Sequence, residues 1–418
     1  MAEDNFQLIV IGGGAAGFFG AITAAEHGVE RVLILEKSKE VLTKVRISGG
    51  GRCNVTHDCL DPRELVKNYP RGHRSLHGPF SRFNAADTIY WFNQRGVPLK
   101  TEADGRMFPS SNTSDTIVRC LTDTAQDNGV EVRTRSKVTA LESLPQRGYA
   151  VHLADGTILQ AANILIATGG LRGAEARQTV RDAEHDFSSP VPSLFTFQIE
   201  DSRLTDLQGV SVPSATVSAL KETMQGPVLI THWGLSGPAI LRLSAWNARR
   251  FSDCKYHFPL TVNWTGALRP HEVEKILITE RKNHSTRSIS KRSLIEGITS
   301  RFWTRLCHAA GITEGQTWAN LTKQQSQSLL KELTAAEFLV TGKSTNKDEF
   351  VTCGGVHLKD LNLKTMESKA SPGLHFAGEV LDIDGITGGF NFQAAWTTGY
   401  LAGSTLAERY QEQSASPS

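Results

Sequence analysis

The chain of 418 residues has few cysteines, no long apolar run and almost no net charge. Its six cysteines are spread along the chain without dense pairing, which fits reduced thiols better than a disulfide scaffold. The first residues, MAEDNFQ, are acidic and polar, unlike a secretory signal. No apolar run approaches the roughly 20 residues that span a membrane. We therefore expect a cytoplasmic protein with no membrane partner.

The chain also lacks the sequence signatures of several kinds of catalytic site. The chain has no His/Cys cluster with metal-ligand spacing, no Ser-His-Asp order and no Walker loop, so we expect no metal. The formal net charge of +2 says little about partners, but its distribution says more. Residues 63–82 carry five Lys or Arg against one acid, and residues 269–305 carry nine against four. Such segments are usually solvated surface, and the alternative is an anionic macromolecular partner.

The most informative segment present is residues 8–36, LIVIGGGAAGFFGAITAAEHGVERVLILE. A short apolar run leads into Gly12-x-Gly14-x-x-Gly17, a helical segment follows, and a second apolar run ends on Glu36. The glycines allow a tight turn, close approach of a pyrophosphate and tight helix packing, and the helix N-terminus attracts phosphate. A carboxylate about twenty residues on can accept the ribose hydroxyls. The order of these parts predicts a dinucleotide site.

The periodicity of the remaining sequence predicts an α/β cofactor domain built from both chain ends. Pro190 and Pro192 mark a change to short β-like runs, and a polar, basic, helix-rich piece follows. Glycine-rich motifs return after Ala335. In the first half we predict helices over 84–95 and 113–128, and strands over 97–101, 130–135, 137–141, 149–153, 157–160 and 163–167, with a hairpin turn at Asp155-Gly156. We predict a cofactor domain of residues 1–188 and 335–410, an inserted β-rich domain of 189–268, a small basic helical domain of 269–334 and a disordered tail of 411–418.

NAD and FAD share the opening fingerprint, so the C-terminal motifs decide between them. The segment from Gly378-Glu379 through Gly388-Gly389 opens a helix from about Asn391 to Arg409. Its positive end would lie beside a cofactor, which favours FAD over NAD; the alternative is a glycine loop that only caps a docking helix. No second GxGxxG is present, so a dedicated NAD(P)H domain is missing. We therefore expect NAD(P)H to act as a transient reductant.

Residues 44–56, KVRISGGGRCNVT, resemble the signature of the BaiN/RdsA-type bacterial flavoproteins, also labelled aminoacetone-oxidase-type FAD-binding enzymes. The resemblance continues in residues 102–109, 231–238, 365–369 and 378–394. It implies a two-dinucleotide-fold (Rossmann-like) FAD domain with an inserted β-barrel-like domain and a small helical domain. Residues 171–185 depart from the expected small-residue turn, because they carry Arg172, Arg177 and Arg181.

FAD contacts are expected at the N-terminal glycine turn, the second strand end, the Gly49–Gly51 anion nest, the β-meander and the C-terminal glycine segment. Val138 is included because its strand would bind adenine through its backbone. The residues expected to bind FAD are Gly12, Gly14, Ala15, Ala16, Gly17, Glu36, Lys37, Lys44, Ser48, Gly49, Gly50, Gly51, Arg52, Cys53, Asn54, Val138, Ala167, Thr168, Gly169, Gly378, Glu379, Asp382, Gly388, Gly389, Phe390, Asn391 and Phe392.

Three residues in motif-like contexts are candidates for catalysis or substrate contact: Arg106, His232 and Cys353. Residues such as His232 and Cys353 are more often structural than catalytic, and Arg106 is the better candidate for substrate or phosphate contact. Cys53 and Cys59 raise the alternative of a redox dithiol. Their C-x5-C spacing rotates the two thiols off a common helix face, which disfavours that mechanism.

The family resemblance implies reduction of activated double bonds, including conversion of a uridine in large-subunit ribosomal RNA to dihydrouridine. Reduced flavin would transfer hydride to an electron-poor C=C bond while a protein acid protonates the neighbouring carbon. The two basic segments favour ribosomal RNA as the partner, although they lack the interleaved aromatics of a base-stacking platform. The alternatives are a small-molecule enone, steroid or amine substrate, and a non-catalytic flavin-binding protein.

Overall fold

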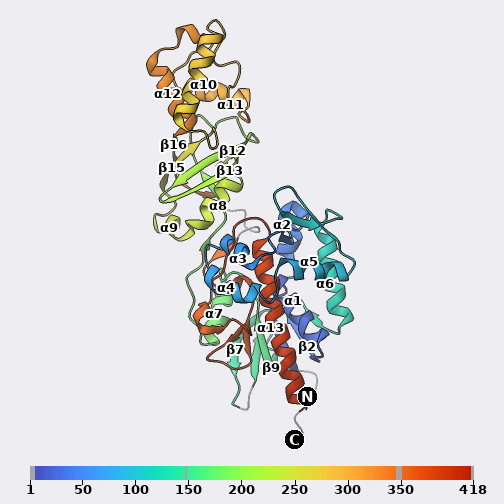
Figure 1. The fold of residues 1–418 in the computed structure, drawn as a ribbon. Coiled ribbons are helices and arrows are strands. Elements are labelled where there is room, and N and C mark those ends of the chain that lie inside the picture. The colour runs from blue at the N-terminus through green and yellow to red at the C-terminus, as the bar shows by residue number, and fades with distance from the viewer. Residues whose placement is uncertain (1–4, 146–147, 345–350, 416–418) are drawn as a thin grey trace. The chain divides into compact units, whose positions relative to one another are not determined.

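A computed structural model describes residues 5–145, 148–344 and 351–415 and divides the chain into two compact units (Figure 1). Unit 1 comprises residues 1–192 and 347–418, and unit 2 comprises residues 193–346. The chain therefore leaves the first unit once and returns to it, so that both chain ends build one fold. Among the described residues, no helix combines the length and apolar character needed to cross a membrane.

The centre of unit 1 is a nine-stranded sheet whose middle strands are parallel. Its order is β19-β20-β21-β9-β1-β2-β6, and β8 and β7 extend from β9. The apolar runs at both ends of the dinucleotide fingerprint form neighbouring parallel strands, and every residue of the second run is buried. The strands are β1 Asn5–Ile11, β2 Val32–Leu35, β6 Glu131–Arg133, β7 Val138–Ser143, β8 Tyr149–Leu153, β9 Ile158–Ile166, β19 Leu361–Asn362, β20 Glu367–Ser368 and β21 Leu374–Phe376. The predicted α/β Rossmann-type domain is confirmed.

Two helices pack against each other beside this sheet: α1 (Ala15–Glu26) and α13 (Phe390–Ala415) (Figure 1). Glycines make the approach possible. A Cβ on Gly399 would lie 2.7 Å from the Ala16 carbonyl oxygen, and one on Gly403 would lie 2.4 Å from the Gly20 carbonyl oxygen. The backbones of the two helices therefore meet without intervening side chains.

Smaller elements surround the sheet of unit 1. The predicted helices over 84–95 and 113–128 are confirmed as α5 (Ala85–Gln94) and α6 (Ser114–Asp127), each with a side-chain N-cap. The other elements are α2 Thr43–Gly51, β3 Thr56–His57, α3 Pro62–Leu65, α4 His73–Phe80, β4 Leu99–Thr101, β5 Arg106–Pro109, α7 Ala174–Asp182, β10 Val191–Pro192 and β18 Thr352–Cys353.

Two boundaries in unit 1 differ from the sequence-based expectation. Residues 157–160 and 163–167 were expected to form two strands but belong to one strand, β9, which pairs with β8 at its start and with β1 along its length. Residues 411–415 were expected to be disordered but continue α13, while residues 416–418 lie outside the described residues. A helix already packed on α1 extends at little cost, because each added residue completes another backbone hydrogen bond.

Unit 2 is built on a seven-stranded antiparallel sheet with the order β16-β15-β12-β13-β14-β11-β17. Its core includes Phe251 and Phe258, whose rings stack with centroids 3.9 Å apart. The strands are β11 Thr196–Gln198, β12 Ser211–Ala219, β13 Glu222–Thr231, β14 Gly234–Ser236, β15 Phe258–Asn263, β16 Ala336–Val340 and β17 Gly342–Ser344. The helices are α8 Pro238–Trp246, α9 Ala248–Asp253, α10 Pro270–Asn283, α11 Ser300–Ala309 and α12 Lys323–Thr334.

The inserted unit ends later in the chain than the sequence suggested. Residues 336–344, which we assigned to the cofactor domain, form β16 and β17, and these strands pair with β15 and β11. Within the described residues, no pairing joins the two end strands of this sheet, so the strands follow an open path rather than a closed barrel. The helices of 270–334 belong to the same compact unit as this sheet. The returning chain therefore supplies both end strands of this sheet, β16 and β17.

Candidate functional site

The glycine turn between β1 and α1 brings backbone segments close together. Gly12 has a φ of +118°, and a Cβ there would lie 2.3 Å from the Ala167 carbonyl oxygen at the end of β9. A Cβ on Gly17 would lie 2.0 Å from the Gly12 carbonyl oxygen, so the helix packs directly on the turn. By contrast, a Cβ on Gly14 would meet nothing within 4 Å. The turn is therefore closed on the protein side and open in front of the first N–H groups of α1, as a phosphate cradle requires.

Glu36 organises the loop after β2. One carboxylate oxygen accepts a hydrogen bond from the Gly13 backbone N–H at 2.9 Å, and the other accepts from the Ser38 N–H at 2.8 Å. The Ser136 N–H donates to the Glu36 carbonyl oxygen at 2.8 Å, which ties the segment before β7 to the same place. The structure thus brings Glu36 and Val138, the first residue of β7, to neighbouring segments beside the glycine turn.

The glycine run after residue 48 adopts a left-handed path. Ser48 is extended, and Gly49, Gly50 and Gly51 have φ of 58°, 68° and 82°, so the helix that begins at Thr43 breaks there. An anion nest needs neighbouring residues of opposite hand. That alternation occurs at Gly51, Arg52 and Cys53, with φ of 82°, −100° and 60°, rather than within the three glycines.

The start of α13 lies against the segment that follows this run. A Cβ on Gly389 would lie 2.4 Å from the Thr56 carbonyl oxygen. The Phe390 ring stacks on His57 with centroids 4.7 Å apart, and the Trp396 indole N–H donates to the Val55 carbonyl oxygen at 2.9 Å. Two motifs more than 300 residues apart in the sequence are therefore held together at one helix N-terminus.

The turn before α13 is held by Asn391. Its side-chain oxygen accepts from the Gly385 N–H at 2.8 Å, and its side-chain N–H donates to the Gly385 carbonyl oxygen at 2.9 Å. Phe392 stacks on Trp396 with centroids 5.6 Å apart. These contacts fix the direction of the helix N-terminus, whose first N–H groups lack helical partners.

An ion pair joins the remaining predicted residues of unit 1. Lys44 contacts the Glu379 carboxylate, which also accepts from the Thr352 N–H at 2.7 Å. Burial alone would raise the pKa of Glu379, but Lys44 and the Thr352 N–H outweigh it, and the pKa lies below its ordinary value. Arg172 reaches the same place, because its Nε donates to the Thr352 hydroxyl at 3.1 Å. Glu379 is therefore an ionised anchor between the two ends of the cofactor domain.

The other expected FAD residues occupy varied positions. Ala16 is buried against Gly378, because a Cβ added to Gly378 would lie 2.7 Å from the Ala16 Cβ. Lys37 is exposed. The Thr168 hydroxyl at the end of β9 is buried and has no hydrogen-bond partner among the described residues. A buried hydroxyl without a partner carries a desolvation cost, which a ligand group could remove.

Arg106 lies on β5 and is held by two carboxylates. Its guanidinium donates to Glu102 at 3.0 Å and to Asp104 at 2.7 Å, and Arg52 donates to the other oxygen of Glu102 at 2.6 Å. Arg52 and Arg106 both approach the ring of Phe108. The structure thus groups Arg52 with Arg106 on one face of the small β3-β5-β4 sheet.

The other two catalytic candidates lie elsewhere. His232 is exposed at the turn between β13 and β14 in unit 2. Cys353 has no exposed surface, and its strand pairs with β10. A side chain with no exposed surface cannot touch a substrate in this conformation, so we do not retain Cys353 as a catalytic candidate.

The thiols near the glycine run do not form a reactive pair. Cys53 is fully buried, and burial raises its pKa to about 12. The Cys59 pKa is also raised, by burial and then by neighbouring carboxylates. Both thiols stay protonated at neutral pH, whereas a redox dithiol needs an accessible thiolate. Only the Cys53 backbone is left to face a cofactor.

Sequence reasoning missed His57. It packs between Phe390 and Gly105, and a Cβ on Gly105 would lie 2.4 Å from the His57 ring. Burial lowers its pKa against the pull of Asp104, so the ring is neutral at pH 7. Its position directly after the 44–56 motif could have identified it as a candidate site residue. The sequence shows no metal-ligand or catalytic-triad spacing around His57 that would have done so.

The residues of unit 1 fit FAD. The open space at Gly14, the carboxylate of Glu36 and the Thr168 hydroxyl, which has no partner among the described residues, lie at the carboxyl ends of β1, β2 and β9, where ligands bind in open α/β sheets. In the described part of the chain, no group of three or more His, Cys, Asp or Glu could hold a metal ion.

Comparisons with known proteins agree with this geometry. A family model described as the HI0933-like protein Rossmann domain matches residues 6–405. The ribosomal RNA dihydrouridine synthase of Escherichia coli (strain K12) is 30% identical over 413 residues, which cover 96% of this chain and 98% of that protein. The 3-dehydro-bile acid delta(4,6)-reductase of Clostridium scindens is 27% identical over 416 residues, covering 96% of this chain and 99% of that protein.

Solved structures share the fold at low sequence identity. The 3-ketosteroid-delta4-(5alpha)-dehydrogenase of Rhodococcus jostii matches with a TM-score of 0.53 and 14% identity, covering 97% of each chain. Because the family model spans nearly the whole chain and a relative is 30% identical over 96% of it, the family is established. The chain belongs to the HI0933-like family and is a flavin-dependent oxidoreductase.

Proposed function

We propose that this protein uses FAD to reduce an activated C=C bond, and that its substrate is a uridine of large-subunit ribosomal RNA, which becomes dihydrouridine. The observation that carries the substrate is the 30% identity, over 96% of this chain, to a relative named ribosomal RNA dihydrouridine synthase. A second such relative, from Haemophilus influenzae, has the same identity and coverage of this chain. We further propose NAD(P)H as the reductant and the cytoplasm as the location.

FAD binding in this proposal uses the site described above. The N-terminus of α1 would hold the pyrophosphate, Glu36 the adenosine ribose and the strand of Val138 the adenine. When bound, FAD supplies hydride transfer to an electron-poor C=C bond. The start of α13 would place positive helix-dipole charge beside the redox group, where it would stabilise negative charge.

Arg106 is our proposed substrate contact. Its guanidinium is partly exposed at 37% and is oriented by Glu102 and Asp104. A held guanidinium can donate to the carbonyl oxygens of a uracil ring, and this donation draws electron density from the conjugated C=C bond. The C=C bond then accepts hydride more readily.

The decisive experiment is mass spectrometry of large-subunit ribosomal RNA from cells with and without the gene. We expect one uridine to carry two additional mass units only when the gene is present. Purified protein should be yellow and release FAD on heating. Identical RNA masses in the two strains would exclude the RNA substrate, and a protein that cannot be loaded with FAD would exclude the whole proposal.

A small-molecule C=C bond is the second candidate, because a relative at 27% identity over 96% of this chain is named a bile acid reductase. The two candidates separate in one assay on FAD-loaded protein. A steroid enone that oxidises the reduced flavin in rapid mixing, while uridine-containing RNA does not, would favour the small molecule.

A further inference from the structure

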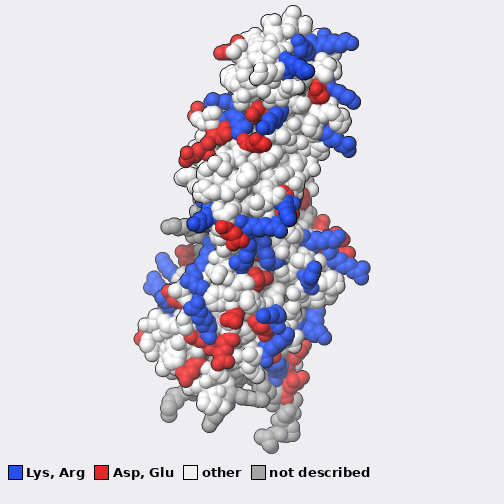
Figure 2. Space-filling view, turned by 90° about the vertical axis from the view of Figure 1, so that its left-hand side faces the viewer, with Lys and Arg blue, Asp and Glu red and all other residues white. Residues whose placement is uncertain are grey.

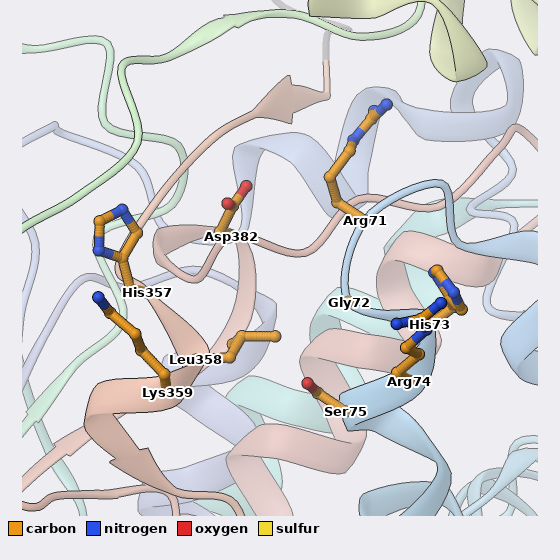
Figure 3. A pocket seen from close by; sticks show the side chains of 9 residues that line it. All are labelled: Arg71, Gly72, His73, Arg74, Ser75, His357, Leu358, Lys359 and Asp382. Carbon is orange, nitrogen blue, oxygen red and sulfur yellow. The ribbon is translucent and has the colours of Figure 1, made fainter.

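A cavity of about 400 Å³ opens in unit 1 where the start of α4 faces the segment before β19 (Figure 3). It borders the C-terminal glycine segment, because Asp382 is one of its walls. Its nine lining residues are Arg71, Gly72, His73, Arg74, Ser75, His357, Leu358, Lys359 and Asp382. The cavity therefore adjoins the proposed FAD site but is lined mainly by residues that FAD binding does not use.

The lining contains basic groups that are not paired with a carboxylate of the described residues. His73, Arg74 and Lys359 are exposed, and no carboxylate among the described residues lies within ion-pair distance of Arg74 or Lys359. Arg71 differs from Arg74 and Lys359, because it forms a bidentate ion pair with the fully buried Asp384. In Figure 3, Arg71 points away from His73 and Arg74. Arg71 thus holds the turn, while Arg74 and Lys359 are left for a ligand.

Two acids limit the positive charge of the cavity. Asp382 is the one carboxylate among the nine lining residues, and one of its oxygens accepts from the Ser188 hydroxyl at 3.1 Å. Asp360 lies 3.9 Å from His357 and offsets that ring when it is protonated. Arg74 and Lys359 outnumber the unpaired Asp382, so the cavity attracts anions.

The start of α4 adds backbone donors to these side chains. Gly72 is the N-cap residue and brings no side chain to cap the helix, and the first turn contains no acid. The first N–H groups of a helix have no intrahelical partner, and the helix dipole places positive charge there. His73 and Arg74, which carry the first N–H groups of the helix, both line the cavity.

Further basic residues continue from the cavity along unit 1. The Lys369 ammonium donates to the Lys359 carbonyl oxygen at 2.7 Å, and the Arg82 guanidinium donates to the Lys364 carbonyl oxygen at 3.2 Å. These contacts place Arg82, Lys364 and Lys369 near Lys359 and the end of α4. Figure 2 views the side of unit 1 on which α3 and α4 lie, and Lys and Arg side chains are frequent there, with acids among them. A row of cations suits a ligand with several phosphates, such as a polynucleotide backbone.

We propose that this cavity binds a backbone phosphate of the RNA substrate, with Arg74, Lys359 and the start of α4 as donors. The inference rests on the proposed function, since it names where that RNA is held. Bound there, the backbone anchors the strand next to the C-terminal glycine segment. A nucleotide displaced from its stack could then reach the FAD site of the same unit.

The test measures binding of a short fluorescein-labelled, uridine-containing single-stranded RNA to the FAD-loaded protein by anisotropy over a salt series. The variant is the double substitution Arg74→Gln and Lys359→Gln. The matched control, Arg119→Gln with Lys221→Gln, removes two exposed positive charges elsewhere. The slope of log Kobs against log salt should fall by about 0.7 for each RNA phosphate that the variant no longer neutralises. The variant should show this fall with an unchanged flavin spectrum and melting temperature, and the control should match the wild-type protein.

Two results would overturn the proposal. The first is a slope in the variant equal to that of the wild-type protein. The second is unchanged RNA binding together with a raised KM for NADPH, but not NADH, in flavin reduction, which would assign the phosphate site to the nicotinamide cofactor. Failure of the proposed function is detected separately, by ribosomal RNA in which no uridine gains two mass units in a gene-dependent way. The two failures can be distinguished because the binding assay requires no turnover.

Discussion

At the scale of single residues, the site depends on a few charged groups that are buried or partly buried and fully engaged. Glu36 joins the Gly13 and Ser38 N–H groups, and Glu379 joins Lys44 and the Thr352 N–H. Hydrogen bonds to charged groups contribute about 1.5–3 kcal/mol each, about twice as much as neutral ones. Substitution of either carboxylate should therefore weaken FAD binding more than substitution of an exposed carboxylate that has no such hydrogen bonds.

We predict that Glu36→Ala weakens FAD binding. The substitution removes the acceptor for the ribose and frees the Gly13 N–H, which at about 1.5–3 kcal/mol corresponds to a loss of roughly 10- to 100-fold in affinity. The measurement is FAD affinity of the apoprotein by flavin fluorescence quenching. The control is Glu40→Ala, which removes an exposed carboxylate four residues away. Equal FAD affinity in the two variants would contradict the role of Glu36.

His375 gives the protein a pH-dependent stability. It is fully buried on β21, its Nδ1 donates to the Thr365 carbonyl oxygen at 3.0 Å, and its Nε2 has no partner among the described residues. Burial lowers the pKa of the ring from 6.5 to about 4, although the Glu367 carboxylate pulls it upward. Between these values the unfolded chain binds a proton that the folded protein does not. The contribution of His375 to the free energy of unfolding is therefore complete above pH 6.5. It is lost as the pH falls toward 4, by up to about 3 kcal/mol.

We predict that His375→Gln flattens this dependence. The variant should be less stable than the wild-type protein at pH 7, because the hydrogen bond to Thr365 is disturbed, but should lose less stability between pH 7 and pH 5. Urea unfolding at both pH values measures the difference. If the variant and the wild-type protein lose the same free energy of unfolding over this interval, the buried neutral histidine is not the cause.

At the scale of elements, sequence periodicity correctly predicted the helices and strands that local sequence patterns determine. The fingerprint gave β1, α1 and β2, and amphipathic spacing with capping residues gave α5 and α6. Sequence periodicity divided β9 because the polar Gln160 and Asn163 interrupt the apolar run, whereas pairing with β1 and β8 keeps the backbone extended through them. It also misassigned residues 336–340, whose alternating burial is completed only by pairing with β15. Pairing with a distant strand leaves little signal in a short window.

The site shows the same limit. The glycine positions and Glu36 were evident from spacing, because their roles are local. The positions of His57 against Phe390 and of Arg172 at Thr352 depend on contacts between segments far apart in the chain. The arginines of 171–185 are partly structural: the Arg177 guanidinium donates to the Leu171 and Arg172 carbonyl oxygens at 2.9 and 2.7 Å and fixes the turn before α7.

The close packing of α1 on α13 supports a prediction for an element. Gly403→Ala should destabilise the protein by about 1–3 kcal/mol, because the new Cβ would lie 2.4 Å from the Gly20 carbonyl oxygen and 2.8 Å from the Thr23 Cβ. Gln126→Ala on α6 is the control, since that side chain is exposed and alanine favours a helix. Urea unfolding should place the two variants on opposite sides of the wild-type protein, or the control close to it. Equal stabilities of the two variants would show that the helices can separate at little cost.

At the scale of the whole molecule, the residues proposed to bind FAD and the basic cavity belong to unit 1, while His232 and the basic helices of 270–334 belong to unit 2. Each unit has its own sheet and its own buried aromatic residues, including Trp396 in unit 1 and Trp264 in unit 2. A ligand that binds only folded unit 1 stabilises that unit by mass action, at about 2.7 kcal/mol when its concentration is 100 times Kd.

We therefore predict that FAD protects the two units unequally from hydrogen exchange. Peptides from β1, α1, the 44–56 segment and the start of α13 should exchange more slowly when FAD is added to the apoprotein, because their N–H groups are ordered around the cofactor. Peptides from β12, β13 and β15 in unit 2 should keep their rates. The measurement is exchange followed by mass spectrometry with and without FAD, with Glu36→Ala as the variant that should lose the difference. Equal protection of both sheets would show that the cofactor organises the entire chain and that the site is not confined to unit 1.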